Sequence, residues 1–229
     1  MSLKKIGILG GMGPEASAQF YQKMIPISQK KYNAVQDTDY PPMVIYSLPL
    51  VGFNESGIVD QELVLKQLHQ GIKLLNNSGC DFIIMVCNTI HTFIDELQGR
   101  SKAPILSIVE GVVKKVKENK IKSVGLLASE TTFSSMIYDS ILNKNKIHYS
   151  LPDSKGKKEI TKLIFKIMGG EELMKSKNKV IEIAKEMKCQ AVILGCTELP
   201  LAINQNDLKM KVYDSMEILA ESALEYSHG

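Results

Sequence analysis

Residues 80–87 read Cys-Asp-Phe-Ile-Ile-Met-Val-Cys, and residues 189–196 read Cys-Gln-Ala-Val-Ile-Leu-Gly-Cys. The two blocks match without a gap, because each residue of the first corresponds to the residue 109 positions later. In each block an apolar run ends at a cysteine, and a polar pair follows, Asn88-Thr89 or Thr197-Glu198. Such a run predicts a buried strand, and the polar pair predicts the start of a helix. The chain therefore places a thiol twice at the carboxyl end of a buried strand.

Further apolar runs rich in Ile, Val and Leu recur along the chain, separated by longer amphipathic stretches. They predict strands at residues 6–9, 43–46, 82–86, 105–106, 124–127, 191–194 and 210–213. Two of the amphipathic stretches, residues 62–75 and 179–187, keep their apolar residues on one helical face, and each leads into a cysteine strand. Buried strands that alternate with helices predict an α/β fold with parallel sheets.

The repeat extends beyond the cysteine blocks. Residues 6–10 resemble residues 124–128, which lie 118 positions later, and residues 104–110 can be laid on residues 211–217, which lie 107 positions later. We therefore expect two similar α/β domains related by a pseudo-twofold axis, with residues 1–103 in the first and residues 104–210 in the second. Open α/β sheets bind ligands at the carboxyl ends of their strands, so we expect the active site in the crevice between these domains.

Composition excludes several classes of protein. The chain has 229 residues, with 28 Lys plus Arg against 25 Asp plus Glu, and a net charge of +3, which does not favour a nucleic-acid partner. No apolar run approaches the roughly 18 residues of a membrane span, and the amino end lacks a signal-peptide pattern, so we expect a cytoplasmic protein without a membrane partner. Four cysteines without short spacing and four scattered histidines favour reduced thiols over disulfides or a metal site.

The two strand-end thiols suit one kind of chemistry. Inverting a carbon next to a carboxylate requires a base on one face and an acid on the other, and Cys87 and Cys196 could supply both. A helix start stabilises a thiolate, so we expect the pKa of these thiols to fall below the usual value of about 8.5. Cys80 and Cys189 stand at the strand entrances, and we interpret them as small buried hydrophobic residues.

Three motifs in order resemble the cofactor-independent aspartate/glutamate racemases: residues 10–15 (GGMGPE), 87–91 (CNTIH) and 195–198 (GCTE). The resemblance covers nearly the whole chain. It implies that the last helix packs back on the first domain, so that residues 1–103 plus 211–229 form the first domain and residues 104–210 the second. It implies that Cys87 and Cys196 act as acid and base, that neither pyridoxal phosphate nor a metal is needed, and that the protein forms a homodimer. It also implies that Asn88, Thr89 and Thr197 bind the substrate's α-carboxylate and amino group. Residues 129–132 resemble a family loop whose hydroxyl groups help to hold the substrate, and Thr132 is the better match there.

The loop after the first predicted strand allows two interpretations. Gly11 to Ala16 fits the dinucleotide pattern G-x-G-x-x-A, but Glu15 would repel a pyrophosphate and Pro14 lacks an amide hydrogen that could bind it. We therefore expect Gly11 and Met12 to approach a small substrate instead.

Two further residues next to the cysteine motifs are auxiliary candidates. His91 either tunes Cys87 or packs as a capping residue. Glu198 either orients Cys196 or favours the helix start.

The substrate is harder to predict. Some aspartate-specific relatives in this family hold the distal carboxylate with an arginine after the second strand and a lysine in the second half. Residues 47–53 contain no arginine, and the chain's only one is Arg100. Lys157, Lys158 and Lys162 lie near the family's lysine, although each could equally be a helix-surface residue; Lys158 and Lys162 are retained as auxiliary candidates.

The sequence thus predicts an amino-acid racemase for aspartate, glutamate or a similar small amino acid. Two alternatives stay open. The first is another reaction of the superfamily, as in hydantoin racemases, maleate isomerases or decarboxylases. The second is a non-catalytic protein that binds a carboxylate ligand.

Overall fold

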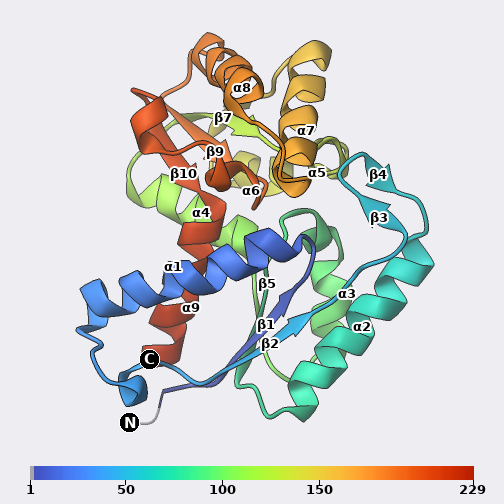
Figure 1. The fold of residues 1–229 in the computed structure, drawn as a ribbon, viewed down its shortest axis with the longest axis vertical. Helices are drawn as coiled ribbons and strands as arrows, with labels where there is room; N and C mark the ends of the chain where they lie inside the picture. The colour runs from blue at the N-terminus through green and yellow to red at the C-terminus, as the bar shows by residue number, and fades with distance from the viewer. Residues whose placement is uncertain (1–2) are drawn as a thin grey trace. The chain divides into compact units, whose positions relative to one another are not determined.

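The computed structural model describes residues 3–229, which divide into two compact units. The first unit contains the residues up to Phe53, Val59–Ile108 and Met216–Gly229, and the second contains Asn54–Ile58 and Val109–Ser215. Each unit has its own parallel sheet with helices packed around it (Figure 1). No helix within residues 3–229 combines the length and apolar character needed to cross a membrane.

The sheet of the first unit has the strand order β2-β1-β5-β6, with every neighbouring pair parallel. Its strands are β1 (Ile6–Gly10), β2 (Met43–Ser47), β5 (Phe82–Met85) and β6 (Ile105–Leu106), and its helices are α1 (Pro14–Tyr32), α2 (Gln61–Asn77), α3 (Ile94–Arg100) and α9 (Ser215–His228). Helices α1 and α9 contact each other where the rings of Tyr32 and His228 stack with centroids 3.6 Å apart. The last helix therefore packs in the first unit.

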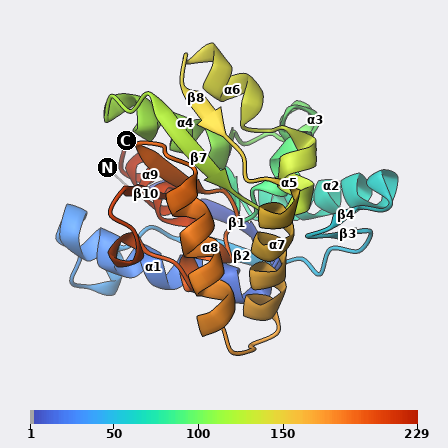
Figure 2. The same cartoon turned by 90° about the horizontal axis from the view of Figure 1, so that it is seen from above.

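The sheet of the second unit has the order β10-β9-β7-β8 and is also parallel. Its strands are β7 (Ser123–Leu127), β8 (His148–Ser150), β9 (Ala191–Leu194) and β10 (Lys211–Asp214), and its helices are α4 (Ile108–Glu118), α5 (Glu130–Ser135), α6 (Asp139–Lys144), α7 (Ser154–Met168) and α8 (Met174–Glu186). Helices α7 and α8 lie side by side in both views (Figures 1 and 2). Sequence reasoning missed β8, because this short edge strand has no apolar run.

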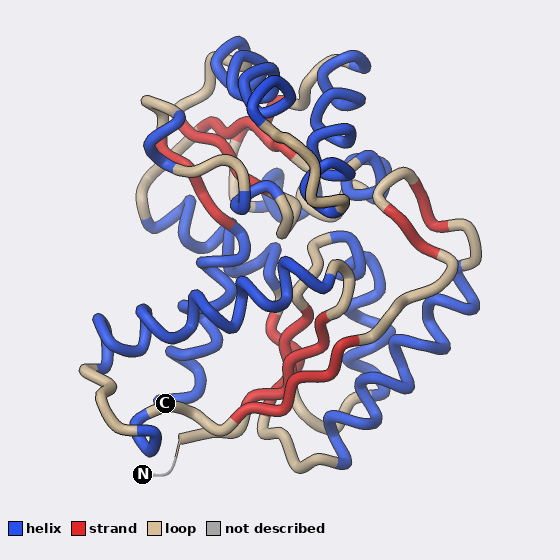
Figure 3. Tube along the Cα trace, viewed as in Figure 1, coloured by secondary structure: helices blue, strands red, loops and turns tan. Residues whose placement is uncertain are grey.

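A hairpin interrupts the first half of the chain. Its strands are β3 (Phe53–Asn54) and β4 (Gly57–Ile58), drawn in red as a separate pair in Figure 3. The hairpin tip belongs to the second unit, because the Thr131 hydroxyl donates to the Asn54 carbonyl at 2.9 Å and the Thr131 amide donates to the Glu55 carbonyl at 3.3 Å.

The strand register confirms the internal repeat. In each sheet the first strand of the unit is central, the second lies at one edge, the third lies on the other side and the fourth forms the outer edge. The paired residues correspond at the offsets read from the sequence: Ile6 pairs with Phe82 and Val124 with Ala191, while Ile83 pairs with Ile105 and Val192 with Val212. The two α/β halves therefore share one topology.

The observed units differ from the expected ranges in three segments. Strand β10 belongs to the second unit, because a strand stays with the sheet that satisfies its backbone hydrogen bonds, and Tyr213 pairs with Ile193. The expected second domain began at residue 104, but the first unit continues to Ile108 because β6 pairs with β5. The third segment is the hairpin tip described above.

Equivalent glycines explain the cysteines at the strand entrances. A Cβ atom on Gly7 in β1 would lie 3.1 Å from Cys80 Sγ, and one on Gly125 in β7 would lie 3.1 Å from Cys189 Sγ. Cys80 is buried and Cys189 is partly buried. Both thiols thus fill space left by a glycine on the neighbouring strand, which supports their interpretation as packing residues.

Candidate functional site

Cys87 lies at the carboxyl end of the first unit's sheet. Strand β5 ends at Met85, the Val86 amide donates to the Leu9 carbonyl at 2.9 Å, and Cys87 follows with 4% of its surface exposed. A 3-10 helix, η2 (Thr89–Phe93), then leads into α3. The predicted helix start is therefore present, beginning as a tight 3-10 turn.

The polar residues after Cys87 are enclosed by the protein. Asn88 and Thr89 are each 2% exposed. His91 Nδ1 lies 2.8 Å from the Cys87 carbonyl oxygen, and the Ile108 amide donates to Nε2 at 3.2 Å. Because Nε2 accepts this bond, Nδ1 carries the hydrogen and donates to Cys87. His91 therefore ties the Cys87 loop to the start of α4 through both ring nitrogens.

Burial lowers the pKa of His91 from 6.5 to about 4, so the ring is neutral in the folded protein near neutral pH. The folded state then binds fewer protons than the unfolded state between these values, and stability is lost as the pH falls from 6.5 towards 4. We expect His91 to account for a loss of about 3 kcal/mol over this range. Glu55, whose pKa is raised from 4.5 to about 7, contributes an opposite change that all variants share, so the test is the difference between variants. In urea denaturation at several pH values, wild type and His148→Gln, whose imidazole is exposed, should each lose this amount relative to His91→Gln as the pH falls.

The loop after β1 lies at the same sheet edge as Cys87. Leu9 of β1 pairs with Met85 of β5, so Gly11 and Cys87 each follow a paired residue by two positions. The Gly11 amide donates to Ser17 Oγ at 2.8 Å, and the Ser17 hydroxyl donates to the Gly13 carbonyl at 2.8 Å. Ser17 thus fixes the loop that carries Gly11 and Met12, of which Met12 is buried.

Replacing Gly11 with alanine is expected to destabilise the first unit by about 1–3 kcal/mol. Gly11 has a φ of +91°, and an added Cβ would lie 2.5 Å from the Leu48 backbone nitrogen. The control is Gly99→Ala in α3, where the new Cβ meets no described atom within 4 Å and alanine favours the helix by about 0.5–1 kcal/mol. Urea denaturation should move the two midpoints in opposite directions; equal midpoints would contradict the argument.

Cys196 occupies the corresponding place in the second unit. The Gly195 amide donates to the Leu127 carbonyl at 2.7 Å, and Cys196 follows with 5% of its surface exposed. The predicted helix start is here only a 3-10 turn, η3 (Leu199–Leu201). The Cys196 thiol donates to Glu198 Oε2 at 3.0 Å, and the Thr197 hydroxyl donates to the same oxygen at 3.2 Å. Glu198 therefore faces the sulfur directly.

A second carboxylate, Glu55 at the hairpin tip, also approaches Cys196. Its Oε2 lies 4.0 Å from Cys196 Sγ, and its side chain is 3% exposed. Burial and the Glu198 charge raise the pKa of Glu55 from 4.5 to about 7. Burial, then Glu198 and Glu55, raise the pKa of Cys196 well above its usual value. The prediction of a lowered pKa is wrong for Cys196, because burial of the thiol, followed by the charges of Glu198 and Glu55, outweighs the amides of a short turn.

Hydroxyl groups and one aromatic ring complete the surroundings of Cys196. Ser129 and Thr132 are buried, and their hydroxyl oxygens lie 3.1 Å apart. Ser129 follows β7 at the position that Gly11 has after β1. Tyr138 is fully buried, with its ring 3.3 Å from the position of a Cβ on Gly195, and burial together with the Cys196 charge raises the pKa of its phenol. Tyr138 therefore lies close enough to Cys196 for the charge of the thiolate to affect its phenol.

The candidate lysines line a pocket of about 820 Å³ in the second unit. Helix α7 contributes four lysines to it: Lys157, Lys158, Lys162 and Lys166. Lys157 Nζ lies 5.0 Å from the ring centroid of Phe133, and Lys166 pairs with Glu171 at 3.1 Å. Lys158 and Lys162 are exposed at the pocket surface, where they add positive charge.

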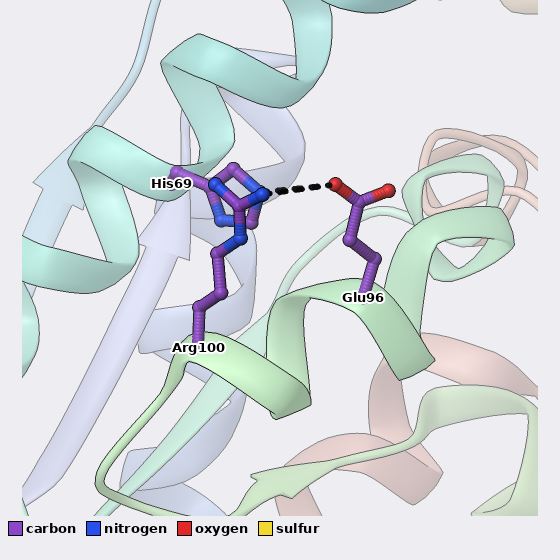
Figure 4. Close-up of polar contacts among 3 residues, drawn as sticks. All are labelled: His69, Glu96 and Arg100. Atoms are coloured by element: carbon purple, nitrogen blue, oxygen red, sulfur yellow. Dashed lines mark hydrogen bonds and ion pairs between the residues drawn. The ribbon is translucent and has the colours of Figure 1, made fainter.

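Arg100 is held in another part of the first unit. Its Nη2 lies 3.9 Å from Glu96 Oε1 on α3, and His69 Nε2 on α2 lies 3.4 Å from the same oxygen (Figure 4). The chain's one guanidinium is therefore exposed and engaged with Glu96, beside the largely buried His69.

The structure gathers the predicted residues into two groups, one in each unit. Gly11, Met12, Asn88, Thr89 and His91 surround Cys87 or share its sheet edge; Thr132, Thr197 and Glu198 adjoin Cys196 or share its edge. Sequence reasoning missed Glu55 and Tyr138. Glu55 stands in an Asn-Glu-Ser-Gly turn, a pattern that favours an exposed carboxylate, so no local signal marked its burial.

Comparisons with known proteins extend over both units. Residues 9–223 match the family model described as Asp/Glu/Hydantoin racemase. A broad specificity amino-acid racemase from Bacillus subtilis is 32% identical over 221 residues, which is 96% of each chain. Two solved structures are similar along nearly their full length. An aspartate racemase homologue from Pyrococcus horikoshii has 31% identity, a TM-score of 0.82 and coverage of 99% of this chain and 100% of that one. An aspartate racemase from Picrophilus torridus has 27% identity, a TM-score of 0.85 and coverage of 98% and 94%.

Proposed function

Because the chain belongs to the Asp/Glu/hydantoin racemase family, we propose that it is an amino-acid racemase that interconverts L and D enantiomers of aspartate, glutamate or a similar small amino acid. One observation carries the proposal: buried cysteines follow equivalent strands of two units with one topology, Cys87 after β5 and Cys196 after β9. Each thiol is thus positioned by a buried strand of its own unit.

In this mechanism the two thiols exchange roles with the handedness of the substrate. One cysteine, as thiolate, removes the α-proton, and the electron pair left on carbon spreads into the α-carboxylate. The other cysteine, as thiol, then delivers its proton to the opposite face of the carbon. The reaction requires both sulfurs to reach one α-carbon. The two thiols carry out the whole proton transfer in this mechanism, so the proposal includes neither pyridoxal phosphate nor a metal.

The polar residues beside each thiol supply the stabilising contacts. Asn88 and Thr89 follow Cys87, and Thr197 follows Cys196, so their amides and side chains are candidates to hold the α-carboxylate and amino group. Hydrogen bonds to that carboxylate strengthen as its charge grows, which lowers the barrier to proton removal. Thr132, beside Ser129, is the candidate hydroxyl from the loop after β7.

The ionisation of Cys196 decides which form of this thiol meets the substrate. A thiol whose pKa is raised keeps its proton near neutral pH, so Cys196 rests as the protonated thiol, ready to act as the acid. Glu198, 3.0 Å from the sulfur, can accept the thiol proton when Cys196 must act as base. Glu198 is thus the auxiliary group of the second thiol, while His91 supports the first through the Cys87 carbonyl.

The side-chain group of the substrate has the fewest candidate contacts. Lys158 and Lys162 are candidates to attract a side-chain carboxylate, because they add positive charge to one pocket of the second unit. Residues 47–53 contain no arginine, and the chain's one arginine, Arg100, pairs with Glu96. Without a bidentate guanidinium clamp, we expect a wider substrate range than aspartate alone. The Bacillus subtilis relative is itself described as a broad specificity racemase.

The test is incubation of the purified protein in deuterated water with each enantiomer of a panel of amino acids. Mass spectrometry follows α-deuterium incorporation, and chiral chromatography follows inversion. Exchange with inversion of aspartate or glutamate is the expected result. Turnover of a hydantoin or of maleate instead would assign another reaction of the superfamily, and saturable binding without exchange would leave a binding protein. Light scattering of the same sample tests the homodimer, and cell fractionation tests the cytoplasmic location, both of which belong to this proposal.

A further inference from the structure

The second unit places three acidic groups in one buried cluster. Cys196 Sγ lies 3.0 Å from Glu198 Oε2 and 4.0 Å from Glu55 Oε2, and all three side chains are at most 5% exposed. Cys196 and Glu198 belong to the same loop after β9, whereas Glu55 comes from the hairpin between β2 and α2. Nothing in the mechanism above uses Glu55.

We propose that Glu55 is a positioning residue that acts through Cys196 and decides whether this thiol serves as acid or as base. The inference rests on the proposed racemase function and deepens it. In its ionised form Glu55 holds Cys196 as the protonated thiol, and in its protonated form it permits the Cys196 thiolate.

The charge balance of the cluster gives the reason. The Cys196 thiol becomes a base when its proton moves to the Glu198 carboxylate, which forms a thiolate and a carboxylic acid without changing the cluster's charge. If Glu55 is ionised, the new thiolate lies near a second negative charge, 4.0 Å away, in a buried site where the repulsion is weakly screened. If Glu55 carries a proton, the thiolate forms without that repulsion.

The fold holds Glu55 in place by its main chain. The Thr131 amide donates to the Glu55 carbonyl at 3.3 Å, and the Thr131 hydroxyl donates to the Asn54 carbonyl at 2.9 Å. Ser129, two residues earlier, hydrogen-bonds the Glu55 side chain and favours its ionised form. Contacts from residues 129–131, which follow β7, therefore hold the Glu55 main chain and carboxyl group beside Cys196.

The titratable groups that adjoin this cluster come from three neighbouring segments and from the pocket beside it. Glu198 and Cys196 face Glu55 from the loop after β9, and Tyr138, ahead of α6, lies beside Cys196. Glu130 on α5 and Lys157 and Lys158 on α7 line the adjoining pocket together with Ser56. Of these, Glu130 offers a matched control, because it is an acid of the same unit that adjoins the hairpin tip.

The experiment measures the ionisation of Cys196 in the full-length protein. Iodoacetamide alkylation of Cys196 is followed by peptide mass mapping between about pH 6 and pH 10 in wild type, Glu55→Gln, Glu55→Asp and Glu130→Gln. We expect Glu55→Gln to lower the midpoint of the alkylation profile by at least about one pH unit, which gives about tenfold more thiolate below the midpoint. Because a thiolate of lower pKa is less nucleophilic, the rate gain is only about threefold.

The control variants separate this role from a structural one. Glu55→Asp keeps the charge and should stay closer to the wild-type midpoint than Glu55→Gln, and Glu130→Gln should keep the wild-type midpoint. An unchanged midpoint in Glu55→Gln overturns the proposal. If alkylation is too slow to map, the ultraviolet absorbance of the thiolate reports the same titration in a chain whose other three cysteines are alanine.

The readout does not depend on turnover, so the two proposals can fail separately. A shifted Cys196 titration in a protein that racemises nothing would keep the role of Glu55 and remove the proposed function. Racemisation with an unshifted Cys196 titration in Glu55→Gln would keep the proposed function and remove the role of Glu55. In an active enzyme, the pH–rate profile of Glu55→Gln is expected to move to lower pH together with the alkylation midpoint.

Discussion

Replacing either Cys87 or Cys196 with serine is expected to lower kcat/KM by about 10²–10⁴-fold for both enantiomers. Serine keeps a small side chain with one hydroxyl in place of the thiol, so the buried loops should retain their shape. Its hydroxyl ionises far less readily than a thiol and removes an α-proton poorly. Because enantiomers have equal free energy in water, kcat/KM must fall equally in the two directions. Chiral chromatography from each pure enantiomer measures both.

The chain provides its own matched controls for this experiment. Cys80 and Cys189 precede the same two strands that Cys87 and Cys196 follow, and they pack against Gly7 and Gly125. Cys80→Ala and Cys189→Ala should therefore retain racemisation, apart from a loss of stability. Full racemisation by either serine variant would exclude the two-thiol mechanism. Retained α-deuterium exchange without inversion in one variant would show that its remaining thiol still removes a proton.

Removing the isoleucine side chains of the two cysteine strands is expected to have the largest effect on stability. Ile84 in β5 and Ile193 in β9 occupy equivalent positions, and both are fully buried. Each change to alanine should cost about 2–5 kcal/mol, because lost burial adds to the cavity that remains. Urea denaturation followed by circular dichroism measures the change in the free energy of unfolding.

The control is Ile45→Ala in the edge strand β2, where the isoleucine is 46% exposed. Its loss should be well below that of either buried isoleucine. Because Ile84 and Ile193 belong to different units, separate transitions in the two variants would also show that the units unfold independently. Losses below about 1 kcal/mol at both buried positions would contradict the packing described for the two strands.

Much of the fold could be predicted from the sequence because its signals are local. The apolar runs identified the principal strands, and the repeat predicted which strands correspond, as the pairing of Ile6 with Phe82 and of Val124 with Ala191 confirms. The edge strand β8 was missed because it is short and lacks an apolar run. Strand β10 was assigned to the wrong half because sheet membership depends on a partner, β9, rather than on neighbours in the chain.

The sequence by itself determined the two matched blocks, the cysteine at the end of each and the polar pair that follows. These features depend on neighbouring residues, and hydrophobic periodicity records them directly. Only the tertiary structure decided the electrostatic environment of Cys196. Glu55 is 141 positions away in the chain, yet its carboxylate lies 4.0 Å from the sulfur. Burial and through-space charge set the pKa of a thiol, and both depend on which distant segments the fold brings together.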